Sequence, residues 1–327
     1  MTTVDATAIV VTHNSVSQVQ DCLSALLSAG LPVRLIDNAS TDGTPALVGA
    51  RFPAVDLLVN DENVGFARAV NQGLAGVRTG SVLLVNPDCV LPPATARGLV
   101  EALRDRPEVG VVAPRLIARD GRVAVSAHPF ESLTSVLGCQ FGAALLPVPV
   151  RKLFSGRSRR RAYDACLRPG EPRTVDWVSG ACLAVRTDLL LDLGGLDEGY
   201  FMYYEDEELC LRAWRRNAAV LYLPTVSATH VGGASSSPGQ TWPHLYASRL
   251  RFFARHRPST FGPVRLAVLL RALLGTALAL ARGLLRPGPA ARRRVRAWRE
   301  IYRIAAAADR TTLSQPVPMT SRSPSCT

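Results

Sequence analysis

Residues 8–14, AIVVTHN, and residues 82–88, VLLVNPD, decide the fold of this 327-residue chain. Each begins with four consecutive apolar residues and ends in polar ones, a pattern typical of a strand buried inside a parallel sheet. Two further apolar runs, 33–36 and 55–59, lie between them and alternate with segments of helical spacing. The alternation predicts an α/β fold with a doubly wound, mostly parallel sheet, which binds its ligands outside the carboxyl ends of the strands.

Polar residues with ligand-binding chemistry occupy those predicted strand ends. Thr12 and Asn14 follow the first strand, Asp37 the second, and Asp88 the strand that ends at residue 85. The residue types alone did not require these four residues to fall at strand ends. Their common position predicts one ligand site at one edge of the sheet.

The segment 194–208, GGLDEGYFMYYEDEE, ends in four consecutive acids just before an apolar-periodic stretch. Adjacent carboxylates repel one another unless water, a cation, a helix N-terminus or a bound substrate offsets their charge. Here they occupy a predicted first helical turn, where the helix dipole favours negative charge. An acidic helix start explains the segment as well as an acid–base site does when it is considered alone.

Seven motifs, read in order, resemble a family 2 glycosyltransferase, and most closely its bacterial rhamnosyltransferase-like members. They are Val11-Thr12-His13-Asn14, the run Asp37 to Gly43, Asn63-Val64-Gly65-Phe66, Asn71-Gln72-Gly73, Asn86-Pro87-Asp88, the 194–208 block and His230. The resemblance covers roughly residues 6 to 257. It implies a GT-A fold, a nucleotide-sugar donor, a divalent metal and inversion at the anomeric carbon.

The donor nucleotide is expected at the first strand ends. Asp37 is predicted to accept a hydrogen bond from the base N3–H, with Thr12 and Asn14 beside the base and ribose. Arg68 is predicted to reach a base carbonyl. The alternatives are a turn capped by Asp37 and a solvated helix arginine at 68.

The predicted metal site combines Asp88 with His230. Relatives usually carry Asp-x-Asp at this strand end, whereas this chain has Asn86-Pro87-Asp88, so Asp88 must supply the carboxylate. Asn86 is then expected to contact the ribose or to support the site. A carboxylate and an imidazole suit Mg²⁺ or Mn²⁺, which would offset the charge of the leaving diphosphate.

Asp206 matches the position of the family's catalytic base. The chain continues with Glu207-Glu208 where relatives have an apolar residue and Asp, so Glu205 and Glu207 remain competitors. Neighbouring acids raise the pKa of a base toward working pH. Gly180 is expected beside the acceptor sugar, and Trp177 either stacks on that sugar or belongs to the core.

The cysteine pattern and the distribution of charge indicate the cellular compartment and the kind of surface that the chain presents. The seven cysteines contain no C-x-x-C pair, and residues 2–7 are polar, so we expect reduced thiols, no secretory signal and a cytoplasmic protein. Basic charge is concentrated at one end. Residues 241–327 hold 16 arginines against two acids, whereas residues 1–240 hold 22 basic and 24 acidic residues. The basic C-terminal region is therefore an attachment surface that is separate from the acidic site.

The apolar stretch 264–285 is long enough to span a bilayer, but Arg265, Arg271 and Arg282 interrupt it. An amphipathic helix in the interface is the preferred interpretation, with the arginines of 292–296 meeting anionic headgroups. The predicted division is a GT-A domain over 1–257 (nucleotide-binding half 1–115, catalytic and acceptor half 116–257), a basic helical membrane-associating region over 258–310 and a disordered tail over 311–327.

Three function classes follow. The first is a glycosyltransferase moving a sugar, rhamnose from dTDP-rhamnose in the preferred version, to a lipid-linked or cell-envelope glycan at the inner face of the plasma membrane. Its donor alternatives are UDP-galactofuranose and a UDP-hexose. The second, a sugar nucleotidyltransferase, is disfavoured because the first strand is not followed by a glycine-rich loop with Arg and Lys. The third, nucleic-acid binding, is disfavoured because the basic tail carries amphipathic leucines.

Overall fold

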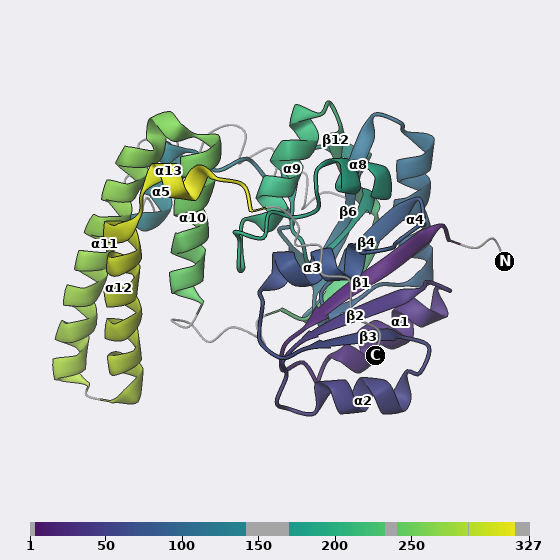
Figure 1. Ribbon diagram of the computed structural model, residues 1–327, viewed down its shortest axis with the longest axis horizontal. Coiled ribbons are helices and arrows are strands. Elements are labelled where there is room, and N and C mark those ends of the chain that lie inside the picture. The colour runs from purple at the N-terminus through teal and green to yellow at the C-terminus, as the bar shows by residue number, and fades with distance from the viewer. Residues whose placement is uncertain (1–3, 142–169, 233–240, 287, 318–327) are drawn as a thin grey trace.

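A computed structural model of the chain describes residues 4–141, 170–232, 241–286 and 288–317. Figure 1 shows an α/β body at one side and a group of long helices at the other. The predicted α/β fold is confirmed, with helices on both faces of one large sheet.

The large sheet has the strand order β3-β2-β1-β4-β11-β6-β12-β5. Its parallel N-terminal half comprises β1 (Ala6–Thr12), β2 (Val33–Asn38), β3 (Asp56–Asn60) and β4 (Ser81–Val85). Its other half comprises β5 (Cys89–Val90), β6 (Val109–Ala118), β11 (Cys182–Arg186) and β12 (Ala219–His230). The strand β11 runs antiparallel to both β4 and β6, and so joins the two halves.

Shorter strands complete the sheets. The strand β7 (Val123–Ala124) pairs with β6 across the turn at Asp120-Gly121, where the sequence predicts a hairpin, and β9 (Arg173–Thr174) pairs with β12. A separate two-stranded sheet joins β8 (Ala127–His128) to β10 (Trp177–Val178).

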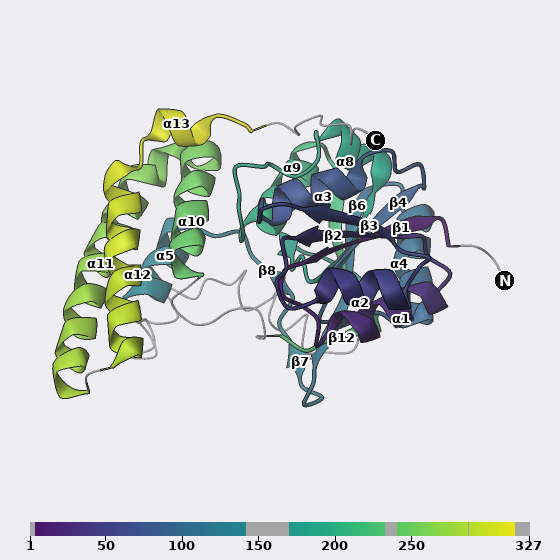
Figure 2. The same cartoon turned by 60° about the horizontal axis from the view of Figure 1, so that its bottom comes forward.

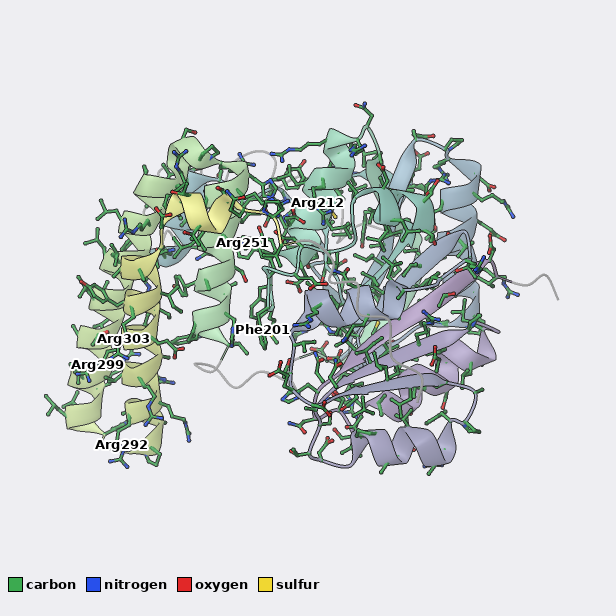
Figure 3. The ribbon with its side chains drawn as sticks, in the orientation of Figure 1. Phe201, Arg212, Arg251, Arg292, Arg299 and Arg303 are labelled. Atoms are coloured by element: carbon green, nitrogen blue, oxygen red, sulfur yellow. The ribbon has the colours of Figure 1, made fainter. Side chains whose placement is uncertain are left out.

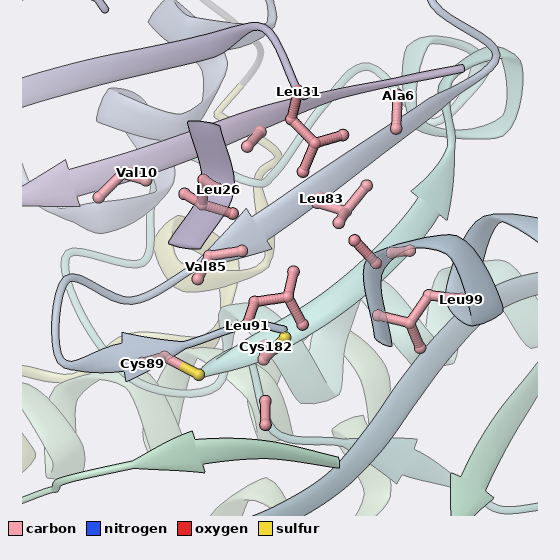
Figure 4. Close-up of a cluster of buried hydrophobic side chains, with 14 of the residues drawn as sticks. Ala6, Val10, Leu26, Leu31, Leu83, Val85, Cys89, Leu91, Leu99 and Cys182 are labelled. Carbon is pink, nitrogen blue, oxygen red and sulfur yellow. The ribbon is translucent and has the colours of Figure 1, made fainter. Parts of the chain in front are cut away.

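Helices cover the sheet because its strands are apolar on both faces. In β1, Ala8 and Val10 contact one buried cluster while Ile9 contacts the other. Figure 4 shows part of the first cluster, in which Leu26 and Leu99 lie with residues of β1, β4 and β11. The covering helices are α1 (Val19–Ser28), α2 (Thr44–Arg51), α3 (Phe66–Leu74), α4 (Pro93–Asp105), α8 (Thr187–Asp192) and α9 (Glu205–Arg215).

The C-terminal helices form a third hydrophobic core with the short helix α5 (Leu133–Gln140). These C-terminal helices are α10 (Trp242–His256), α11 (Pro258–Leu285), α12 (Pro289–Ala307) and α13 (Arg310–Ser314). Phe252 and Phe253 of α10 share this core with Val264 of α11 and Ile301 of α12. The boundary predicted at residue 257 therefore separates helices that pack on one another (Figure 2).

The predicted disorder from residue 311 is wrong for residues 311–317. Asp309 caps α13 by accepting a hydrogen bond from the Thr312 N–H, and the chain continues to Val317 along the α/β body. This order could not be read from a Ser/Thr/Pro-rich composition, because it depends on partners in distant elements. The rest of that predicted tail, 318–327, lies outside the described residues.

Candidate active site

The ends of β1 and β2 bring Thr12 and Asp37 into direct contact, as their strand positions require. They are register partners, and the Thr12 hydroxyl donates to Asp37 Oδ2 at 2.8 Å. The carboxylate also accepts from the Ser40 N–H at 2.8 Å and the Ser40 hydroxyl at 2.6 Å. Both side chains are fully buried. In this conformation the pair shapes the loop, and its contact with a nucleotide stays a prediction.

Asn14 and His13 lie at the exposed mouth of the same loops. Asn14 has a positive φ of 54°, and its side-chain oxygen accepts from the Thr41 N–H at 2.8 Å. His13 Nδ1 lies 2.7 Å from the Asn38 carbonyl oxygen. The two loops are therefore tied together beneath exposed polar groups. The sequence prediction included Asn14 but missed His13.

Arg68, on α3, lies beside an acid of the 194–208 segment. Its Nε is 4.0 Å from Glu198 Oε2, and Glu198 also accepts from the Asn71 side chain at 3.1 Å. Asn71 in turn exchanges hydrogen bonds of 2.8 Å with the backbone of Leu196. The predicted nucleotide arginine thus belongs to a polar contact that joins α3 to this segment.

Gly65 brings the same segment close for a steric reason. Its φ is +86°, and a Cβ added there would lie 2.7 Å from the Phe201 carbonyl oxygen. That oxygen accepts the Phe66 N–H at 2.7 Å. The Asn-Val-Gly-Phe motif therefore functions here as a close backbone contact that a larger residue would disrupt.

Asp88 and His230 meet although 142 positions separate them in the sequence. The strand β12 pairs antiparallel with β5, which places His230 opposite Cys89. His230 Nε2 lies 3.3 Å from Asp88 Oδ1, and the Gly232 N–H donates to Asp88 Oδ2 at 3.1 Å. Burial opposes ionisation of Asp88, but the hydrogen bond and charge of His230 lower its pKa below the usual value.

The Asp88–His230 pair could supply two ligands of the coordination shell of a metal ion. The described residues contain no cluster of three or more His, Cys, Asp or Glu that could hold an ion unaided. Mg²⁺ is commonly bound by one or two protein groups together with substrate phosphates, and neighbouring ligands about 2.1 Å from such an ion lie roughly 3 Å apart. The 3.3 Å separation fits adjacent coordination positions. Asn86, predicted nearby, directly follows β4 and donates its N–H to the Ala181 carbonyl.

The four acids of α9 diverge in the folded chain. Glu208 is fully buried against Arg212, at 2.7 Å, and His256, at 3.2 Å. Glu207 is also buried, and its Oε1 accepts the Glu131 N–H at 2.6 Å. Both therefore hold α9 to its neighbours. Glu205 and Asp206 are the two that stay partly exposed.

Asp206 is held as an oriented carboxylate. Its Oδ2 accepts the Gly180 N–H at 3.0 Å and its Oδ1 accepts the Glu207 N–H at 2.8 Å. A Cβ at residue 180 would lie 3.4 Å from the Asp206 Cβ, so Gly180 allows this close approach. Burial raises the pKa of Asp206, while these two N–H donors oppose the rise.

Glu205 has the opposite environment. Its Oε2 is buried and makes no hydrogen bond with the described residues. Burial and the charge of Asp206 raise the pKa of Glu205 to about 8. The surroundings of Glu205 therefore favour its protonated form, whereas the two N–H donors to Asp206 favour the ionised form of Asp206.

We expect the stability effect of Glu205→Gln to depend on pH. The folded pKa of about 8 exceeds the ordinary 4.5, so the stability that protonated Glu205 contributes is complete below about 4.5 and is lost as pH rises through 8. Glutamine is neutral throughout. The melting temperature of the variant relative to the native chain should therefore rise between pH 5 and pH 9, measured by scanning fluorimetry. The exposed Glu62→Gln is the control, and a pH-independent difference at position 205 would contradict the prediction.

Trp177 belongs to β10 of the two-stranded sheet and is half-buried. Its indole stacks on His128 at 4.4 Å between ring centroids, and its N–H donates to the Pro129 carbonyl at 3.0 Å. One ring face is thus covered within the protein. Stacking of an acceptor sugar stays a prediction for the other face.

A buried network behind the start of α9 was not predicted. Arg249 of α10 donates to both carboxylate oxygens of Glu131 at 3.0 Å and to the Tyr204 hydroxyl at 2.7 Å. Tyr204, at φ 69°, precedes Glu205 and donates to Glu131. Arg249 therefore positions the backbone from which the two site acids project. An arginine among the buried aromatics of α10 was the signal that could have revealed it.

A second network joins the segment 194–208 to the C-terminal helices. Arg251 contacts both carboxylate oxygens of Asp197, the shorter contact being 2.8 Å, and Arg255 pairs with the same carboxylate. Arg251 also donates to the Gln315 carbonyl at 2.8 Å, and the Val317 N–H donates to Asp197. Burial opposes the Asp197 charge, but Arg251 lowers the pKa of this carboxyl. Figure 3 shows Arg251 at the junction of the two parts of the molecule.

Residues 7–149 match the model of Glycosyl transferase family 2. The chain is 33% identical over 219 residues to the N-acetylglucosaminyl-diphospho-decaprenol L-rhamnosyltransferase of Mycobacterium tuberculosis, covering 64% of this chain and 69% of that protein. It is 37% identical over 87 residues to rhamnosyltransferase WbbL of Escherichia coli, covering 25% of this chain and 32% of that protein.

A similar fold occurs in a solved mannosyltransferase of Pyrobaculum calidifontis in complex with GDP-Man and Mn²⁺. Its TM-score is 0.52 at 18% identity, covering 92% of this chain and 86% of that one. The fold of this chain therefore recurs in a solved mannosyltransferase of low sequence identity.

Proposed function

Because this chain belongs to glycosyl transferase family 2, we propose that it transfers rhamnose from dTDP-rhamnose, with inversion, to a lipid-linked glycan acceptor of the cell envelope. The observation that carries the mechanism is the orientation of the Asp206 carboxylate by the Gly180 and Glu207 N–H groups. The rhamnosyl donor and lipid-linked acceptor are supported by the activity named for the mycobacterial relative. UDP-galactofuranose or a UDP-hexose is the alternative donor.

Asp206 serves as the general base. Direct displacement at the anomeric carbon requires a carboxylate that takes the proton of the attacking acceptor hydroxyl. The Gly180 and Glu207 N–H groups fix the orientation of Asp206 and oppose the rise in its pKa that burial causes. Glu207 and Glu208 do not compete for this role, because both are buried whereas Asp206 is partly exposed.

Asp88 and His230 would hold a divalent cation, Mg²⁺ or Mn²⁺. Such an ion offsets the charge of the leaving nucleoside diphosphate. The pair lies where the end of β12 pairs with β5. The loops of Thr12, Asn14 and Asp37 follow β1 and β2 of the same sheet. That arrangement would place the diphosphate between the predicted nucleotide loops and Asp88.

Donor choice is tested by incubating the protein with dTDP-rhamnose, UDP-galactofuranose and UDP-glucose, each with a short soluble acceptor. Release of the nucleoside diphosphate is measured, and the anomeric configuration of the product is read by NMR. We expect dTDP release above the other two and an inverted product. Retention of configuration, or nucleotidyl transfer without sugar transfer, would overturn the proposal.

We expect metal removal to abolish transfer. EDTA should stop nucleoside diphosphate release, and added Mg²⁺ or Mn²⁺ should restore it. Asp88→Ala should weaken donor binding and turnover together, because the diphosphate loses its cation. Asp120→Ala, an exposed acid in the β6–β7 turn, is the matched control. Full activity in excess EDTA would remove the proposed role of both Asp88 and His230.

We further propose that the C-terminal helices rest on an anionic membrane at the cytoplasmic face. One described helix, α11, is long and apolar enough to cross a bilayer. However, α12 packs along it and carries six arginines: Arg292, Arg293, Arg294, Arg296, Arg299 and Arg303. A spanning α11 would draw these into hydrocarbon at about 2.5–3.5 kcal/mol each by insertion scales. A hairpin that lies in the interface avoids this cost.

A further inference from the structure

The hairpin of α11 and α12 encloses a groove that the transfer reaction does not use. Its cavity volume is about 740 Å³. The residues that give it its character are Trp242, Arg271, Arg282, Arg286, Arg294 and Trp298. Figures 1 and 2 show the hairpin extending beyond α10, away from the sheet.

Charge of one sign lines this groove. Four arginines contribute to its wall, and none of its described lining residues is acidic. Within the described part of the chain these four arginines make no ion pair. Arg271 instead lies with its guanidinium 4.3 Å from the centroid of the Trp298 ring. Unpaired guanidinium groups that converge on one cavity favour an anionic ligand, and a phosphate above all.

The floor and rim of the groove are apolar. A Cβ at Gly275 would lie 2.4 Å from the Trp298 ring, so only glycine lets α11 approach α12 here. Trp298 also contacts Trp242, at 5.1 Å between ring centroids. Leu278 and Leu285 line the groove, and their side chains are 46% and 83% exposed. A ligand that fits both features carries a phosphate and a hydrocarbon chain.

We propose that this groove binds one anionic phospholipid of the bilayer, with its phosphate among Arg282, Arg286 and Arg294 and its acyl chain along Leu278 and Leu285. The proposal rests on the membrane-bound glycosyltransferase function proposed above and assigns the surface that makes the contact. Membrane phospholipid is favoured over the lipid-linked acceptor because the lining of the groove includes Leu285, Arg286 and Ala290 at the turn between α11 and α12. Figure 1 shows that end of the hairpin pointing away from α9.

The far side of the hairpin supplies a matched control. Arg292, Arg296 and Arg299 of α12 line a second cavity on the other face of the same hairpin, together with Glu300 and with Leu280 and Leu284 of α11. Figure 3 shows Arg292 and Arg299 projecting from α12. Replacing three arginines by glutamine on either side changes net charge equally. A difference between the two triple variants therefore reports the site rather than overall charge.

Three full-length proteins are compared: the native chain, R282Q/R286Q/R294Q and R292Q/R296Q/R299Q. Sedimentation is measured with phosphatidylcholine vesicles, with and without phosphatidylglycerol. Quenching of tryptophan fluorescence by brominated phosphatidylglycerol reports lipid next to Trp242 and Trp298. We expect the groove variant to lose about 100-fold in partition to anionic vesicles and to lose the quenching. The control variant should lose clearly less than the groove variant and should keep the quenching, because its three arginines do not line the groove.

Equal loss in both triple variants would overturn the proposal in favour of diffuse electrostatic attraction. Unchanged vesicle binding with a raised KM for a lipid-diphosphate acceptor would assign the groove to the acceptor instead. Donor turnover on a soluble acceptor should be the same in all three proteins. Its absence in the native chain would refute the proposed function without bearing on the lipid result.

Discussion

Replacing Asp206 by asparagine should lower kcat by roughly 10² or more, because the variant has no carboxylate to take the acceptor proton. Asparagine keeps the size of the side chain and retains one oxygen that can accept the Gly180 or Glu207 N–H. The affinity for the donor should change little. Steady-state transfer kinetics and nucleotide binding by calorimetry measure the two effects separately.

The neighbouring acids supply the controls for that result. Glu205→Gln should keep most activity near neutral pH, because Glu205 is already protonated there. Glu207→Gln can still accept the Glu131 N–H and should also remain active. Near-normal turnover by Asp206→Asn, with an inactive Glu205→Gln or Glu207→Gln, would move the base to the inactive position.

Replacing Asp197 by asparagine should destabilise the whole chain. The change removes the carboxylate shared by Arg251 and Arg255 and leaves buried guanidinium charge unpaired. Breaking one partner of such a pair costs about 3–5 kcal/mol, which should lower Tm by roughly 5–15 °C. Activity should fall as well, since Asp197 belongs to the segment that leads to Asp206.

Asp192→Asn is the matched control for position 197. Asp192 pairs with Arg216 at 2.9 Å, but both side chains are more than half exposed. An exposed ion pair contributes about 0–1 kcal/mol, so Tm should change little. Equal effects at 192 and 197 would mean that the Asp197 network adds no more than a surface ion pair. Thermal unfolding followed by circular dichroism decides between the two outcomes.

The α/β fold was predictable because its signal is local. Strands such as 8–11 and 82–85 are continuous apolar runs, and strands of that kind are stable only when both faces of the sheet are covered. The antiparallel insertion of β11 between β4 and β6 was not predicted, because strand order depends on contacts between distant segments.

The site was predictable in its residue types and less so in their environments. The sequence paired Asp88 with His230, and these two side chains are in contact. It expected Gly180 beside the acceptor sugar, and it did not predict that the Gly180 N–H donates to Asp206. It could not separate Glu205 from Asp206 or Glu207, since four adjacent acids are alike until neighbours supply different donors and different burial. Glu131, which binds the Tyr204 hydroxyl and Arg249, carried no motif at all.

The amino-acid sequence alone carries the α/β class, the family motifs and the separation of a basic helical end from a nearly neutral body. The first and last of these follow from apolar periodicity and from charge counts, which do not depend on tertiary contacts. The folded chain was needed to show that Glu205 and Asp206 have different hydrogen-bond environments, that Asp197 pairs with Arg251, and that α10 packs with α11 and α12. Each of these depends on desolvation and on partners far away in the chain, and both arise only when the folded chain brings distant residues together.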